Sequence, residues 1–320
     1  MEIKKAVITA AGRGVRLYPA ADTVQKAMLP LVDHDGLSKP VIQVIAEEAL
    51  ASGIEEICIV CAPGDEEQYL RQFRLLRENL VQAHQGVAWA QDEAARLSDL
   101  MRRIQFAPQE QPKGYGHAVY CAKEFVAGEP FLLLLGDHVY ISHVAGQRCA
   151  EQLMELARRE SCAVAAVQAT REHQVGRYGT LSGAREPNMT GVYRIETIIE
   201  KPSVSEAELE LQTPGLRAGH YLCFFGIYVL TPTVFDILEQ RAADAAELQL
   251  TPALHQLAHR ERYLALEVKG ARYDIGGRLG LFQAQLALGL ASPVRDEMLT
   301  AATEILADPR TAQNPGPEQG

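Results

Sequence analysis

Continuous apolar runs and helical patterns alternate along the first half of the chain. Such runs cover residues 5–10, 56–61 and 131–135, and a continuous apolar run is typical of a parallel strand buried on both faces. Between the first two runs, apolar residues at helical spacing predict a helix over residues 40–52, which Gly53 would end. Because a strand–helix–strand connection is nearly always right-handed, the first two strands are expected to be parallel.

The elements that follow repeat this order. The pattern predicts helices at 65–82 and 88–103, a short strand at 104–107, a glycine-bearing loop at 109–118 and a helix that ends near residue 123. Strand, turn, helix and strand repeat often enough to indicate a doubly wound α/β fold with a parallel sheet.

The second half has a different pattern. A buried strand is predicted at 163–169, but the later strands alternate polar with apolar residues and have fewer helices between them, which is typical of mixed or antiparallel sheet. Strands are expected at 178–180, 191–200, 221–230 and 263–268, and helices at 232–240, 251–259 and 278–290. The expected fold is a doubly wound, mostly parallel, Rossmann-like mixed sheet with a smaller β-rich portion.

The chain shows no internal repeat and no linker-like composition between residues 1 and 300. We therefore expect a single domain over 1–300, with one functional half at about 1–140 and the other at about 141–300. The tail at 308–320 is polar and rich in Pro and Gly, a composition that favours disorder.

Composition narrows the function classes. The 320 residues are 47% hydrophobic and carry a net charge of −10, which allows a large core and disfavours a nucleic-acid partner, since duplex binding needs a basic face. The chain has no run of ~18 apolar residues and its N-terminus leads directly into a strand, so we expect a cytoplasmic protein without a membrane partner. Any anionic ligand would need a local cationic pocket, aided by a divalent metal.

The six cysteines are expected to be reduced, because they are scattered through apolar segments. Cys58 and Cys61 form a C-x-x-C spacing within a predicted strand, where a period of two sends them to opposite faces. Core packing is therefore favoured over a redox or zinc site.

A glycine loop follows the first strand. Gly12 and Gly14 lack Cβ atoms where the chain turns after Ala10 and Ala11, so backbone N–H groups can approach phosphate oxygens, and Arg16 and Lys26 add positive charge. Dehydrogenases that bind dinucleotides also begin with a G-x-G, but the third glycine of their pattern is absent here and no acidic residue ends strand 56–61. A turn with a purely structural role is a further alternative.

Two aspartates and one Glu-Lys pair are candidate functional residues. Asp137 follows four consecutive leucines and Asp274 precedes a predicted helix; each is either a helix cap or a metal ligand, and together they would suit octahedral Mg²⁺. Glu200 and Lys201 precede Pro202, which holds its predecessor extended. They could bind sugar hydroxyls and a phosphate, or form a solvated charge pair before a turn.

These pieces occur together and in order, and the chain resembles the bacterial UTP:glucose-1-phosphate uridylyltransferases of the sugar nucleotidyltransferase family. The matching stretches are Ala10-Ala-Gly-x-Gly-x-Arg16, Lys26-x-Met-Leu-Pro30, Gln109 with Gly114-x-Gly-His-Ala118, Leu135-Gly-Asp137, Arg177-Tyr-Gly179, Glu200-Lys-Pro202, Gly226-x-Tyr-Val-Leu230, Glu247-Leu-Gln-Leu-Thr251 and Lys269-Gly-x-Arg-Tyr-Asp274-x-Gly276. Each is short, but nine in the right order, from residue 6 to about 290, are specific.

The resemblance implies a nucleotidyltransferase-type fold with a nucleotide-binding first half and a sugar-phosphate second half. It implies Mg²⁺-dependent transfer from UTP to glucose-1-phosphate by direct attack at the α-phosphate, giving UDP-glucose and pyrophosphate. The implied roles are base binding by Ala10, Ala11, Gln109 and Gly114, phosphate binding by Arg16 and Lys26, metal binding by Asp137 and Asp274, glucose binding by Gly179 and Glu200, and binding of the acceptor phosphate by Lys201.

Some positions depart from the family pattern. Family members usually carry Thr where this chain has Val15, and Glu or Gln where it has Ala27. They usually carry an acidic or small residue in place of His138 and Cys in place of Ile275. His138 is interpreted as a loop residue rather than a ligand, because imidazole suits Mg²⁺ poorly. The departures leave open another nucleotide such as dTTP or another sugar-1-phosphate, and also a catalytically weak sensor of nucleotide sugars. The apolar C-terminal helices suggest a homo-oligomer.

Overall fold

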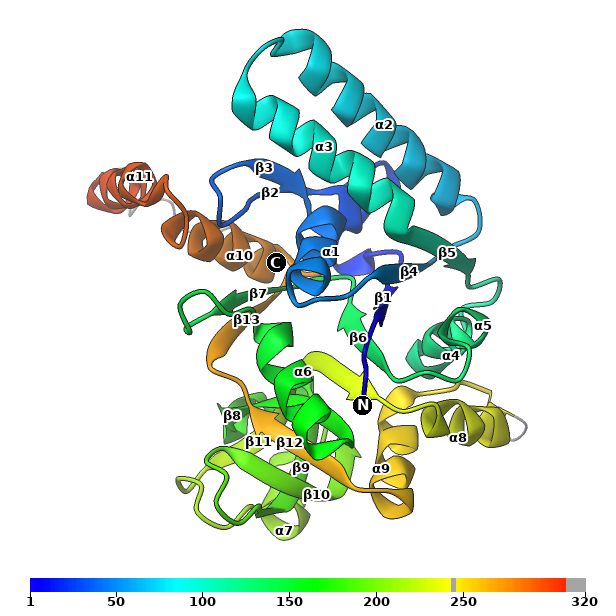
Figure 1. Cartoon of the computed structure of the whole chain (residues 1–320). Coiled ribbons are helices and arrows are strands. Elements are labelled where there is room, and N and C mark those ends of the chain that lie inside the picture. Colours follow the sequence, from blue (N-terminus) through cyan, green and yellow to red (C-terminus); the bar gives the residue numbers. More distant parts are fainter. Residues whose placement is uncertain (243–245, 309–320) are drawn as a thin grey trace, which may run out of the picture.

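The computed structural model describes residues 1–242 and 246–308, and a nine-stranded sheet runs through that part of the chain (Figure 1). The strands lie in the order β5-β4-β1-β6-β11-β8-β12-β10-β9. Their bounds are β1 (Lys5–Thr9), β4 (Glu56–Cys61), β5 (Ile104–Pro108), β6 (Phe131–Leu135), β8 (Ala163–Arg171), β9 (Gly179–Arg185), β10 (Val192–Glu200), β11 (His220–Leu230) and β12 (Tyr263–Glu267).

The half of the sheet built by the first 140 residues is parallel, as the apolar runs predict. β1 pairs in parallel with β4 on one side and β6 on the other, and β4 pairs in parallel with β5. Val7 therefore lies beside Cys58 and Leu133. All of these positions are buried, which is why polar residues are absent from the middle of these runs.

The other half is mixed. β11 is antiparallel to both β6 and β8, β12 is parallel to β8, and β10 is antiparallel to β12 and β9. The predicted doubly wound mixed sheet is confirmed, with its parallel pairings concentrated in the first half. The register of β11 shifts between Phe224 and Tyr228, where Gly226 has φ 94°, a conformation that favours glycine.

Helices cover both faces of the sheet. They are α1 (Val41–Ala51), α2 (Asp65–Ala83), α3 (Ala88–Arg103), α4 (Tyr115–Tyr120), α5 (Lys123–Val126), α6 (Cys149–Glu160), α7 (Val204–Glu210), α8 (Thr233–Ala242), α9 (Leu250–Arg260), α10 (Arg278–Leu290) and α11 (Arg295–Ala307). The predicted helices are present with small shifts of their ends. The one expected to end near residue 123 is instead two short helices, α4 and α5, and α6, α7 and α11 were not predicted.

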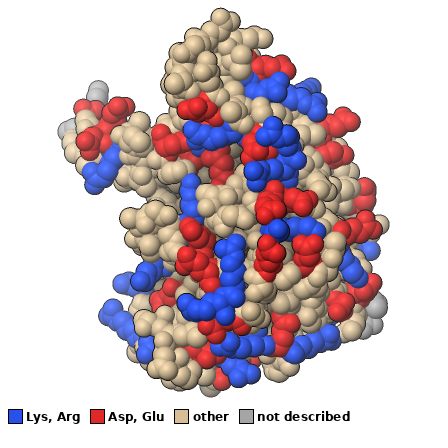
Figure 2. Space-filling model, in the orientation of Figure 1, with Lys and Arg blue, Asp and Glu red and all other residues tan. Residues whose placement is uncertain are grey.

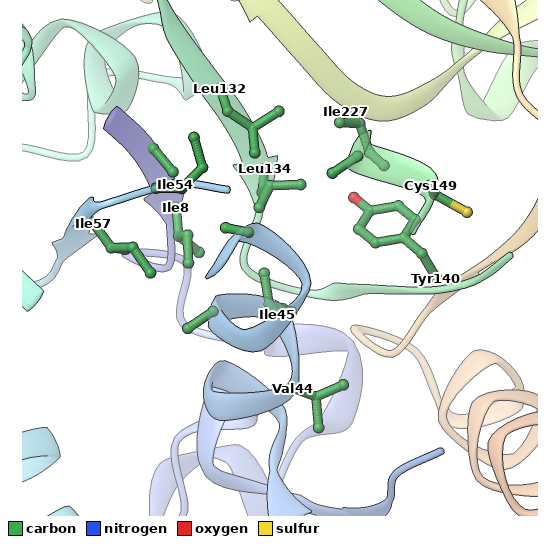
Figure 3. Packing of buried hydrophobic residues seen from close by; sticks show 14 of the residues in the cluster. Ile8, Val44, Ile45, Ile54, Ile57, Leu132, Leu134, Tyr140, Cys149 and Ile227 are labelled. Atoms are coloured by element: carbon green, nitrogen blue, oxygen red, sulfur yellow. The ribbon is translucent and has the colours of Figure 1, made fainter. Parts of the chain in front are cut away.

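Two apolar cores lie on the two sides of the sheet. Figure 3 shows part of one, in which Ile8 and Leu134 of the sheet meet Ile45 of α1. Cys61 belongs to this core and Cys58 to the other, so the two thiols lie on opposite faces, as predicted. Burial raises the pKa of each thiol to about 12, which agrees with core packing.

Two small ribbons stand apart from the main sheet. β2 (Pro30–Val32) pairs with β3 (Ser38–Pro40), and β7 (His138–Ser142) pairs with β13 (Gly270–Asp274). The β7–β13 ribbon joins segments about 130 residues apart in sequence, so no local pattern could have predicted it.

Helices α10 and α11 project from one side of the molecule (Figure 1). All but the first residue of the predicted disordered tail lies outside the described residues. Within residues 1–242 and 246–308, no helix combines the length and the apolar character that crossing a bilayer requires.

Side chains of both charges are intermixed over the face shown in Figure 2, whereas one lysine is fully buried. Lys39 on β3 is 2% exposed and donates to Asp33 Oδ2 at 2.9 Å, Asp35 Oδ2 at 2.7 Å and Glu47 Oε2 at 2.7 Å. These contacts tie the β2–β3 ribbon to α1. Burial by itself would lower the pKa of Lys39, but the charges of Glu47 and Asp33 and the hydrogen bonds raise it above its usual value.

Replacing Lys39 with methionine is expected to lower the free energy of unfolding by about 3–5 kcal/mol, because removal of one partner leaves buried charges uncompensated. Chemical denaturation at neutral pH measures this. Arg102→Gln is the control for an exposed pair: Arg102 binds Asp99 at 2.8 Å, its side chain is 73% exposed, and its loss should cost less than about 1 kcal/mol. Equal effects of the two substitutions would contradict the expectation.

Candidate active site

A cleft of about 1060 Å³ lies where the two halves of the sheet meet. Predicted site residues from both halves line it: Arg16, Asp137, Gly179, Glu200, Lys201 and Asp274. On the first half, the cleft lies beyond the carboxyl ends of β1 and β6. Ligands collect at that edge in open α/β sheets, because loops after the strands leave a crevice there.

Asp137 is held at the end of β6. The N–H of Gly136 donates to Thr9 O at 2.9 Å, and a Cβ at residue 136 would lie 2.5 Å from that oxygen, so only glycine allows this approach. Asp137 then accepts hydrogen bonds from Lys26 Nζ at 2.6 Å and His138 Nδ1 at 2.9 Å. Because the strand β7 follows directly, the alternative that Asp137 caps a helix is wrong.

Asp274 reaches Asp137 through the β7–β13 ribbon. In that ribbon Asp274 pairs with His138, and the N–H of Ile275 donates to Asp137 O at 2.9 Å. Arg16 binds both carboxylate oxygens of Asp274, at 2.8 and 3.2 Å. Helix α10 begins only at Arg278, so Asp274 is not its N-cap. The ribbon therefore brings the two predicted metal ligands together.

The charge of Asp137 is maintained in a mostly buried position. Burial would raise the pKa of this carboxyl, but the hydrogen bond and charge of His138, followed by those of Lys26, outweigh it, and the pKa lies well below its usual range. Asp137 is therefore an anion at neutral pH. His138, interpreted from sequence as a loop residue, is instead the first residue of β7 and contacts this carboxylate.

The donor set fits a small divalent cation. One ligand atom each from Asp137, His138 and Asp274 lie within 4.8 Å of one another. Two carboxylates and space for further oxygen ligands suit Mg²⁺, which binds proteins through one or two carboxylates plus phosphates and water. Gly276 leaves that space open: a Cβ there would lie 2.7 Å from Arg16 Nη2, 3.0 Å from Asp274 Oδ1 and 3.1 Å from Asp137 Oδ2.

The glycine loop approaches this group from β1. Ala10 still belongs to the strand edge, since its N–H donates to Val60 O at 2.7 Å, and Ala11 follows it. Gly14 has φ 65°, in the left-handed region, and a Cβ at Gly12 would lie 3.4 Å from Lys26 Nζ. The two glycines thus let the loop pass close to the lysine that binds Asp137.

Gln109 and Gly114 lie together after β5. The Gln109 side chain is 8% exposed and donates from Nε2 to Gly114 O at 3.1 Å, with His117 Nδ1 3.0 Å away. Gly114 has φ 102°, and a Cβ there would lie 2.6 Å from Leu248 O. Two backbone hydrogen bonds extend the edge of the sheet here. The N–H of Ala10 donates to Val60 O of β4, and the N–H of Gln109 donates to Cys61 O at 2.8 Å.

The predicted sugar-side residues also lie together. Gly179 pairs with Glu200 across β9 and β10, and a Cβ at Gly179 would lie 2.7 Å from Phe224 Cδ2 and 3.1 Å from Glu200 Oε2. Lys201 Nζ lies 3.6 Å from Glu200 Oε1. The backbone of Lys201 has φ 48°, rare for a residue with a side chain. Glu200 and Lys201 therefore form the charge pair that the sequence left open as an alternative, but this pair lines the cleft.

Sequence reasoning missed two side chains in this half. Thr251 donates from Oγ1 to Glu200 Oε2 at 2.6 Å, and Arg272 lies in the cleft against Tyr178. Both residues lie within stretches that carry the family resemblance, so the signal was present. Their partners are far away in the chain, and the motif alone assigns no contact to them.

The fold and site define the class of protein. Residues 5–289 match the sequence model of the nucleotidyl transferase family, and the chain belongs to this family. The family membership predicted from the short motifs is thereby confirmed, and the protein is a nucleotidyltransferase.

Individual relatives are more specific. The chain is 35% identical over 309 residues to the UTP–glucose-1-phosphate uridylyltransferase YngB of Bacillus subtilis (strain 168), covering 95% of this chain and 96% of that relative. It is 36% identical over 303 residues to the UTP–glucose-1-phosphate uridylyltransferase of Streptococcus pneumoniae serotype 4, covering 93% and 94%.

Solved structures agree. A UDP-glucose pyrophosphorylase in complex with UDP-glucose superposes with a TM-score of 0.71 at 30% identity, covering 89% of this chain and 98% of that one. The UTP-bound enzyme of Acinetobacter baumannii superposes with a TM-score of 0.76 at 29% identity, covering 95% and 100%.

Replacing Gly276 with alanine is expected to lower kcat/KM about 100-fold, because its Cβ would displace the carboxylates and Arg16, and displacements near 1 Å can cost that much. Gly277→Ala is the control, since its Cβ would lie 3.8 Å from Arg16 Nη1, an ordinary contact. Steady-state kinetics, with thermal unfolding of both variants, test this. Activity of Gly276→Ala equal to that of the control would show that the close approach is not needed.

Proposed function

We propose that this nucleotidyltransferase transfers the uridylyl group of UTP to glucose-1-phosphate, giving UDP-glucose and pyrophosphate. The observation that carries the proposal is the cleft itself. The Asp137–Asp274 pair lies beside the glycine loop and is bound by Lys26 and Arg16, and Lys201 lines the same cleft. Relatives that match nearly the whole chain bear the name of this reaction.

The chemistry needs alignment and charge neutralisation. A phosphate oxygen of glucose-1-phosphate attacks the α-phosphorus of UTP in line, and pyrophosphate leaves. This nucleophile is already an anion at neutral pH, so no general base and no covalent enzyme intermediate are required. Arg16, Lys26 and Lys201 offset the repulsion between two anionic substrates and stabilise the charge of the transition state.

Asp137 and Asp274 would hold Mg²⁺, which supplies a Lewis acid that neutralises phosphate charge when it is bound. Both carboxylates now pair with Lys26 and Arg16. Phosphate oxygens are the natural alternative partners of these two cations, because guanidinium and ammonium groups bind them strongly. The same four side chains would thus serve metal and nucleotide together.

The remaining roles extend the proposal to the substrates. The base would lie at the strand edge formed by Ala10, Ala11, Gln109 and Gly114, with the backbone at Gly12 and Gly14 along the phosphates. Glucose hydroxyls would bind Glu200 beside Gly179. Thr251 fixes the Glu200 carboxylate, which supports a sugar-binding role because a positioned carboxylate can accept two hydroxyl hydrogen bonds.

Two departures from the family pattern leave the paired aspartates and their cations in place. Ala27 is 1% exposed and packed in the core, whereas Val15 is 73% exposed, and the ion pairs of Asp137 and Asp274 are made without either side chain. A weak sensor of nucleotide sugars is the second candidate function, prompted by these departures. Self-association through exposed apolar residues of α10 and α11, among them Phe282 and Leu306, and a cytoplasmic location stay predictions.

A panel of nucleoside triphosphates against several sugar-1-phosphates tests the function. Pyrophosphate release should be fastest with UTP and glucose-1-phosphate. Faster release with dTTP or with another sugar-1-phosphate would keep the reaction type and change the substrate. Silence with every pair, alongside binding of UDP-glucose, would favour the sensor. Thermal stabilisation by NADH but not UTP would favour a dehydrogenase instead.

Asp137→Ala and Lys201→Ala are each expected to raise the barrier by about 3–4 kcal/mol, because each removes one pre-organised electrostatic group. Lys4→Ala is the control for a lost charge, since Lys4 pairs with Glu2 and Glu55 on the surface. A chelator should abolish wild-type turnover, and added Mg²⁺ should restore it. A folded Asp137→Ala or Lys201→Ala variant that turns over within tenfold of wild type would refute the role of that residue.

A further inference from the structure

Arg272 on β13 lies in the cleft without a counter-charge. In the described part of the chain, the other cations assigned to the site each pair with a carboxylate: Arg16 with Asp274, Lys26 with Asp137, and Lys201 with Glu200. No carboxylate of residues 1–242 or 246–308 lies within ion-pair distance of Arg272, which is half-buried. A partly desolvated cation without a partner is costly unless a ligand supplies the anion.

The guanidinium is held in place by aromatic rings. Its Cζ lies 3.9 Å from the centre of the Tyr178 ring and 5.9 Å from that of Phe225. Phe225 in turn stacks on Tyr140 with ring centres 5.5 Å apart, and Tyr140 donates to Gly226 O at 2.9 Å. Stacking on a ring face fixes the plane of the guanidinium and leaves its N–H groups to point outward at the edges.

Arg272 lies on the same strand as Asp274 and against Tyr178, the neighbour of Gly179 in the chain. Residues two apart in a strand share a face, so Arg272 and Asp274 point to the same side of the β7–β13 ribbon, about 7 Å apart along the strand. The ring of Tyr178 supports Arg272, and the backbone carbonyl of Tyr178 accepts a hydrogen bond from the backbone N–H of Lys201 at 3.1 Å. The backbone of Lys201 therefore lies beside the residue whose ring supports Arg272, immediately before Gly179, and both cations line the same cleft.

Electrostatics agree with this placement. The pKa of Tyr228 is raised first by burial, raised further by the charge of Glu200 and lowered by that of Arg272. One phenol thus lies within electrostatic reach of the predicted sugar-binding carboxylate and of the unpaired arginine. Arg272 belongs to the acceptor half of the cleft, not to the glycine loop.

We propose that Arg272, oriented by Tyr178, binds the phosphate of the sugar-1-phosphate together with Lys201 and so selects a phosphorylated acceptor. The inference rests on the proposed function. A planar guanidinium can bind two phosphate oxygens at once, whereas the Lys201 ammonium acts as a point charge. Two cations on one phosphate would restrict the orientation of the attacking oxygen more than one point charge does.

Arg272→Gln is expected to raise KM for glucose-1-phosphate about 10- to 100-fold, the range for losing a charged hydrogen bond, and to leave KM for UTP within about twofold. Arg272→Lys keeps the charge but loses the planar contact and should recover only part of the effect. Arg194→Gln, on the exposed side of β10, is the matched control. Thermal unfolding of each variant separates misfolding from lost binding.

Tyr178 supplies a second test. Tyr178→Phe retains the ring and should behave as wild type, whereas Tyr178→Leu removes the stack and should raise KM for glucose-1-phosphate but not for UTP. A KM for glucose-1-phosphate in Arg272→Gln equal to that of Arg194→Gln would overturn the proposal, as would an equal rise in KM for UTP.

Binding of inorganic phosphate separates this inference from the proposed function. Calorimetric titration should show weaker binding to Arg272→Gln than to wild type and to Arg194→Gln, whichever substrates the enzyme uses. No pyrophosphate from UTP and glucose-1-phosphate would defeat the proposed function alone. Equal phosphate binding by all three proteins, or none by wild type, would defeat the role of Arg272.

Discussion

The antiparallel pairing of β7 with β13 is the constraint on which the site depends. It places Asp274 opposite His138 and brings the backbone of Ile275 onto Asp137, so two carboxylates from distant parts of the chain lie side by side. Like charges at this separation repel, and Lys26 and Arg16 offset the repulsion. Without the ribbon, each aspartate would be an ordinary polar residue at the end of a strand.

Charge balance is organised differently in the interior and in the cleft. Lys39 is buried and saturated by three carboxylates, an arrangement that locks the β2–β3 ribbon and leaves nothing for a ligand. In the cleft the pairs are more accessible, from Lys26–Asp137, with side chains 12% and 18% exposed, to Arg16–Asp274, with 59% and 32%, and a phosphate can replace a carboxylate as the partner of either cation. Arg272 differs from these pairs, since its support is aromatic and no carboxylate of the described residues lies within ion-pair distance of it.

Glycines define the shape of the site as much as the charges do. Gly136 and Gly276 each occupy a place where a Cβ would meet backbone or a carboxylate at about 3 Å or less. Gly179 has the same role between Phe224 and Glu200. The sequence predicted that Gly12 and Gly14 would admit phosphates. Gly136 and Gly276 lie within stretches that carry the family resemblance, but the sequence assigned them no role, because the atoms they make room for come largely from other elements.

The sequence by itself determined the first half of the sheet, the positions of most helices and the family. These depend on periodic burial and on motifs whose residues are close in the chain, as in the leucine run before Asp137. Only the tertiary structure decided that Asp137 and Asp274 meet, that His138 begins a strand and contacts Asp137, and that Arg272 stacks on Tyr178. Those contacts join residues up to about 140 positions apart, and local periodicity carries no information about which distant strands pair.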